Sequence, residues 1–125
     1  MSDLLDAFLD EAADTADFYT DWVRTKLLDP SADDVRFSEH AADFRRASQL
    51  VSEAPDPAAA LDAVVGVIAH CVEGTVQSLL VALDNGTKVA DVGTVALVDS
   101  ATGESLVGNG AYHELLLEHL RRNRA

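Results

Sequence analysis

The chain has 125 residues, 48% of them apolar and 25% charged, which fits one globular domain and argues against a disordered chain. Its formal net charge is −13, from 22 acidic residues and nine lysines and arginines. Nucleic acid and anionic membrane surfaces are therefore poor partners, because phosphate contacts need lysine and arginine. The single cysteine, Cys71, excludes an intrachain disulfide.

Neither a targeting signal nor a membrane span is expected from the hydropathy pattern. The start, MSDLLDAFLDE, is acidic, whereas a secretory signal is basic and then apolar. The longest apolar stretch, residues 63–72, includes His70 and has about half the length that crosses a bilayer. We therefore expect a soluble, cytoplasmic protein without membrane contact.

Aspartates recur every third or fourth residue at the start of the chain. At about 100° per residue they fall within an arc of about 80° on a helix. This pattern predicts an amphipathic helix from Ser2, as the N-cap, to Leu28, ended by Asp29 and Pro30. We name these residues the aspartate stripe: Asp3, Asp6, Asp10, Asp14, Asp17 and Asp21. The expected buried side lies opposite the stripe and holds Leu5, Phe8, Ala12, Ala16, Tyr19 and Val23.

Two further long helices are expected between Pro30 and Leu83. The first begins at Ser31 or at Ser38 and ends before Pro55. The second has Asp56 as its N-cap, followed by Pro57, and carries a broad apolar stripe as far as Leu83.

This last helix is expected to be central and to end at an Asn85–Gly86 cap. Cys71 lies beside its apolar stripe and is expected to be a buried thiol. An alternative is that residues 79–83 form a strand that turns at Asn85–Gly86.

The pattern changes after Gly86. Residues 94–98 and 104–107 favour strands around a turn at 99–103, with a third short strand near 88–92 and a closing Gly108–Asn109–Gly110 turn. A final helix with arginines near its end is expected over about 110–123.

The sequence thus predicts a mostly α (α+β) fold in one compact domain, residues 1–125. It comprises three long helices (about 2–84), a β-hairpin (about 88–108) and a C-terminal helix (about 110–123).

The segment HELLLEH, residues 113–119, lacks the spacing of a zinc-binding helix. Such a helix needs histidines at i and i+4, and the i+4 position here is Leu117. His113 is expected to be partly buried, with a carbonyl or carboxylate partner, whereas His119 gives no signal. Since nucleophile elbows and phosphate loops are also absent, we predict no catalytic residue, no metal ligand and no cofactor.

The aspartate stripe has three interpretations. It is a solvated face, or a docking surface for a basic partner, or a source of Mg²⁺ or Mn²⁺ ligands. In the third case Glu11–Ala12–Ala13–Asp14 resembles the E-x-x-D motif of all-helical nucleotide pyrophosphatases. The predicted partner-binding residues are Asp6, Asp10, Asp14, Asp17 and Asp21.

A short, acidic chain without catalytic residues resembles the antidote or immunity proteins that bind and block a basic toxin. We therefore expect a non-enzymatic inhibitor, antidote or regulator that docks a basic protein through the stripe. The alternatives are a metal-dependent, all-helical hydrolase of phosphorylated small molecules and a structural subunit. A homodimer is also expected, through the hairpin edge or the apolar surface of the third helix.

Overall fold

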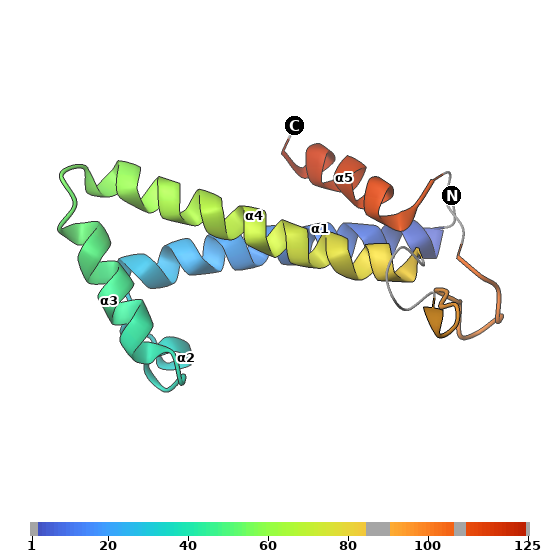
Figure 1. The fold of residues 1–125 in the computed structure, drawn as a ribbon, viewed down its shortest axis with the longest axis horizontal. Helices are drawn as coiled ribbons and strands as arrows, with labels where there is room; N and C mark the ends of the chain where they lie inside the picture. The colour runs from blue at the N-terminus through green and yellow to red at the C-terminus, as the bar shows by residue number, and fades with distance from the viewer. Residues whose placement is uncertain (1–2, 85–90, 107–109, 125) are drawn as a thin grey trace. The chain divides into compact units, whose positions relative to one another are not determined.

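The computed structural model describes residues 3–84, 91–106 and 110–124, and these are mostly helical (Figure 1). The contacts divide the chain into a terminal unit, residues 1–16 with 73–125, and a middle unit, residues 17–72. Each unit thus holds part of the first and part of the fourth helix. The helices are α1 (Asp3–Leu28), α2 (Asp33–Arg36), α3 (Ala41–Ser52), α4 (Pro57–Leu83) and α5 (Tyr112–Asn123).

The bounds predicted for the first, third and final long helices agree with α1, α4 and α5. Asp56 accepts a hydrogen bond from the backbone N–H of Ala59 at 3.1 Å, as an N-cap before Pro57 should. Because α4 continues through residues 79–83, the alternative strand there is wrong. The Asn85–Gly86 cap lies outside the described residues.

A single helix that begins at Ser31 is wrong, because the segment forms two helices, α2 and α3; the alternative start at Ser38 lies three residues before α3. Ser38 explains the break. Its hydroxyl and its backbone N–H both donate to the carbonyl of Val35, a local bond that competes with helix continuation. The predicted Ser31 cap is also wrong, since Ala32 precedes α2.

The predicted β-hairpin is wrong too, so the fold is mostly α without the β component in the part of the chain that is described. Residues 94–98 and 104–106 meet in one isolated antiparallel bridge, Val98 to Ser105. Gly103, at φ 75°, turns the chain between them, and the N–H of Leu106 donates to the carbonyl of Leu97 at 2.8 Å. The valines of these two short segments stay exposed, so pairing the segments buries too little apolar surface to stabilise a ladder of backbone hydrogen bonds. The third strand and the closing turn fall largely outside the described residues.

In the middle unit, α1 packs on α4 through buried apolar side chains. Leu27 of α1 meets Leu61 and Val65 of α4, and an ion pair joins Arg24 to Asp62 at 2.6 Å. Burial of these side chains stabilises the unit by about 1.5–3 kcal/mol each before the entropy cost of folding. Partly buried residues around them are Val23, Phe44, Ala47, Val51 and Val64.

In the terminal unit, the buried side of α1 differs from the predicted side. Leu5, Leu9 and Ala13 are fully buried, whereas Phe8 is 36% exposed. Each buried residue directly precedes an aspartate of the stripe, so the stripe borders the core about a quarter turn away instead of lying opposite it. The other buried residues of this unit are Ala16, Leu80, Leu106, Leu115, Leu116, His119 and Leu120.

Helix α4 is unusually apolar for its exposure. Its length and composition would allow it to cross a membrane. The most apolar 18 residues of the helix have a mean hydropathy of 1.6, and only 11% of these residues are buried. Core helices of soluble proteins and signal sequences meet the same criterion. Cys71 is exposed on this helix, so the expectation of a buried thiol is wrong.

Candidate functional site

The aspartate stripe lies along α1 as predicted, but three of its members, Asp6, Asp10 and Asp14, contact α5. His119 of α5 is fully buried. Its Nδ1 contacts the carboxylate of Asp10, and its Nε2 lies 3.2 Å from Asp6 Oδ1. Nδ1 therefore faces a carboxylate oxygen, whereas Nε2 lies between a carboxylate oxygen of Asp6 and the guanidinium of Arg122, 3.4 Å from its Nη2.

Three further polar contacts in the same unit involve residues at the end of α5. Asn123 Nδ2 donates to Asp14 Oδ1 at 2.9 Å, and Arg122 lies 4.0 Å from Asp6. Arg124 pairs with Glu73 of α4 at 2.5 Å. Side-chain nitrogens of the chain's own C-terminal helix therefore lie beside the carboxylates of Asp6, Asp10 and Asp14, three of the five predicted partner-binding residues.

The start of α5 is held by the carboxylate that follows α4. Asp84 accepts hydrogen bonds from the backbone N–H groups of Tyr112 at 2.8 Å and His113 at 3.2 Å. Its second oxygen lies 2.6 Å from His113 Nδ1. Burial opposes ionisation of Asp84, but these hydrogen bonds outweigh it and hold its pKa below the ordinary value. The expected partner of His113 is thus a carboxylate that caps the helix.

The other two predicted residues, Asp17 and Asp21, belong to the middle unit and flank exposed aromatic rings. Phe18 is 60% exposed and Tyr19 is 49% exposed. Their rings meet edge to face at 5.3 Å between centroids, and Tyr19 meets Trp22 at 6.2 Å. We call Asp17, Phe18, Tyr19, Asp21 and Trp22 the acidic aromatic patch.

Sequence reasoning missed both His119 and the aromatic patch. A signal for His119 was present, because it shares a helical face with Leu115, Leu116 and Leu120. Tyr19 is predicted from the sequence to lie on the buried side with Leu5, whereas the structure buries Leu5 and Leu9 and leaves Tyr19 49% exposed.

The metal interpretation named Asp10, Glu11, Asp14 and Asp17. Within residues 3–84, 91–106 and 110–124, no group of three or more histidine, cysteine, aspartate or glutamate side chains is placed to hold a metal ion. In comparisons with known proteins, no family model, no curated protein and no solved structure matches this chain.

Proposed function

We propose that this chain is a non-enzymatic, acidic binding protein of the cytoplasm that docks a basic protein partner, as an inhibitor, antidote or regulator does. A net charge of −13 favours association with a cationic surface and speeds the encounter. The docking site that we propose is the acidic aromatic patch, where the rings of Phe18 and Tyr19 are exposed.

The single observation that carries the proposal is the exposure of Phe18 and Tyr19 between two aspartates. Aromatic residues are enriched in protein interfaces, where they supply large, rigid contact areas. Exposing them to water on one helix face brings no folding benefit. The aspartates on both sides of the aromatic residues would favour a partner whose binding surface has an apolar centre surrounded by lysine or arginine.

The experiment is affinity capture from cells that express the chain naturally, followed by identification of the retained protein. Calorimetry with the purified partner then compares the wild-type chain with Phe18→Ala/Asp21→Lys. We expect a basic partner whose affinity falls with added salt, and a loss of at least about tenfold in the variant, the effect of losing one aromatic anchor and one charge.

Glu11→Lys is the matched control, because Glu11 is an exposed acid on α1 outside the patch. It should change the affinity by about twofold at most. A partner that binds the patch variant as tightly as the wild type, or a partner without basic character, contradicts the proposal.

We also propose that two copies associate through α4. Val67 of α4, in the middle unit, is 65% exposed, and the helix places few charges beside it. Of those charges, Glu73 is neutralised by Arg124 and Asp62 by Arg24. Two strongly acidic copies could therefore approach most easily along this helix, where covering apolar surface is favourable.

A further inference from the structure

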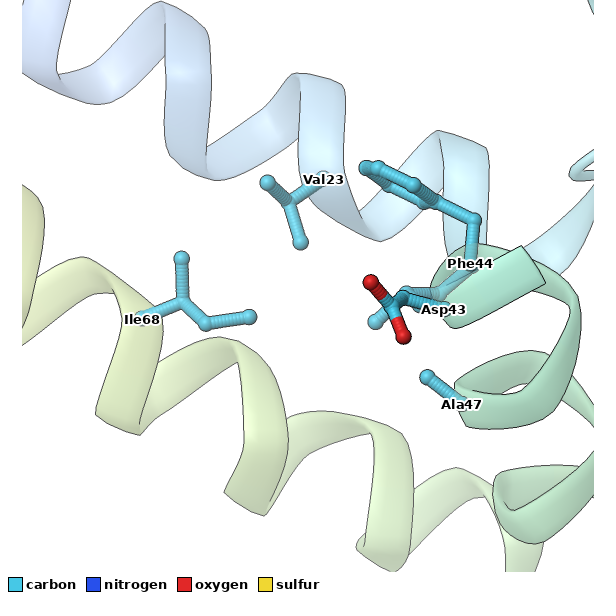
Figure 2. Close-up of a pocket in the computed structure, with 6 residues that line it drawn as sticks. Val23, Asp43, Phe44, Ala47 and Ile68 are labelled. Carbon is cyan, nitrogen blue, oxygen red and sulfur yellow. The ribbon is translucent and has the colours of Figure 1, made fainter. Parts of the chain in front are cut away.

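The middle unit contains an apolar hollow between α1, α3 and α4, and Figure 2 shows the side chains around it. Its volume is about 220 Å³. Small-molecule sites span about 300–1,000 Å³, so this space better suits one amino-acid side chain. The lining residues are Val23, Leu27, Asp43, Phe44, Ala47 and Ile68.

One charged residue, Asp43, lies at the rim of this otherwise apolar hollow. Its side chain is 83% exposed and lies 3.3 Å from His40 Nδ1. The lining therefore combines an apolar wall with one negative charge at a solvent-exposed position.

This combination matches a long cationic side chain. Lysine and arginine lay an apolar stem along apolar surface while the charged head stays in water. Arginine fits better than lysine, because its planar guanidinium can pair with a carboxylate through two hydrogen bonds and stack on an aromatic ring. Phe44 supplies such a ring, and Asp43 is its neighbour in α3.

We propose that the hollow receives an arginine side chain of the basic partner, with its stem against Val23 and Ile68 and its guanidinium at Asp43. This inference deepens the proposed function and rests on it. The acidic aromatic patch adjoins the hollow, because the ring of Trp22 packs edge to face on that of Phe44, with 5.7 Å between the ring centroids. One basic segment could thus contact both sites.

The test is a methyl NMR titration of the full chain with N-acetyl-L-arginine amide. We expect saturable shifts of the methyl groups of Val23, Leu27 and Ile68 in the millimolar range. N-acetyl-L-norleucine amide, which has a similar stem and no charge, should bind about two- to fivefold more weakly, as should N-acetyl-L-lysine amide.

Two variants identify the site. Asp43→Asn should weaken arginine binding by about two- to fivefold, and Ala47→Leu should abolish the shifts by filling the hollow. Asp33→Asn is the matched control, because Asp33 is 80% exposed and lies outside the hollow, and it should leave the affinity unchanged.

The inference is overturned if none of the three amides shifts these methyl groups up to about 50 mM, if the lysine or norleucine amide binds as tightly as the arginine amide, or if Asp43→Asn binds like the wild type. The proposed function and the arginine site in the hollow can be refuted independently of each other. A partner lost from Phe18→Ala/Asp21→Lys but retained by Asp43→Asn would leave that function standing while the hollow is refuted.

Discussion

His119 of α5 contacts two members of the aspartate stripe, Asp6 and Asp10. Its imidazole is fully buried, yet its two nitrogens face Asp6 and Asp10, whose side chains are 43% and 51% exposed. Desolvation of the ring is thus offset by two carboxylates that remain partly in water. Without the ring, α5 would lose its principal polar link to α1.

The replacement His119→Leu is therefore expected to lower the free energy of unfolding by about 1.5–3 kcal/mol, the range for a hydrogen bond to a charged group. Urea denaturation at neutral pH measures the difference. In a double-mutant cycle, His119→Leu and Asp10→Asn should cost less together than the sum of their separate costs.

His40→Leu serves as the control, since His40 is 67% exposed beside Asp43, and its effect should stay within about 0.5 kcal/mol. Strict additivity of the two substitutions in the cycle would show that the His119–Asp10 contact contributes nothing to stability.

Asp84 makes the stability depend on pH in a defined direction. Its folded-state pKa is held below the ordinary value of 3.8, so folding favours the ionised form. The resulting stabilisation is complete above that value and is lost as the pH falls through the folded-state pKa.

Asp84→Asn should therefore destabilise the protein at pH 7, and the gap from the wild type should narrow as the pH falls below about 4. Asp84→Ala, which removes the helix cap as well, should cost about 0.5–2 kcal/mol at neutral pH. Unfolding free energies measured from pH 7 to pH 3 test both expectations. A gap between Asp84→Asn and the wild type that widens in acid would mean that the folded state binds the proton more tightly.

At the scale of elements, the sequence is informative where a repeated apolar pattern coincides with a cap. This holds for α1 and for α4, where Asp56 and Pro57 mark the start. It fails after Pro30, because Ser38 bonds to a nearby carbonyl and interrupts the helix. It fails again in residues 94–106, where strand propensity lacks the packed neighbours that make a sheet stable.

The cap of α4 gives a direct test at this scale. Asp56→Ala should lower the free energy of unfolding by about 0.5–2 kcal/mol, whereas Asp56→Ser should retain most of it, because serine is also an effective N-cap. Chemical denaturation of the three proteins measures both. Equal losses in the alanine and serine variants would mean that the carboxylate acts through its charge alone.

The candidate site could be predicted only in part, for a reason that concerns the whole molecule. The spacing of the aspartates places them on one face of α1, but it cannot show that α5, more than 100 residues later, supplies His119 and Asn123 to that face. The distinction between Asp10, paired within the chain, and Asp21, beside exposed aromatics, depends on tertiary packing.

Association of two copies is likewise a property of the whole molecule. If α4 is the interface, Val67→Lys should weaken dimerisation by about tenfold or more, because it places a charge in a covered apolar surface. Sedimentation velocity over a range of protein concentrations measures this. Leu28→Lys, at an apolar residue of α1 that is 68% exposed, is the control and should leave the association unchanged. A wild-type chain that stays monomeric at every concentration would refute the α4 interface.

Our central claim is that Asp6, Asp10 and Asp14 of the aspartate stripe contact α5, and we propose that the acidic aromatic patch binds a basic partner. Hydrogen exchange of the chain with and without the captured partner tests this claim most directly. We predict new protection over residues 17–22 and unchanged exchange over residues 3–14 and in α5. New protection over residues 3–14, together with faster exchange in α5, would contradict the claim, because the partner would then have displaced the chain's own helix.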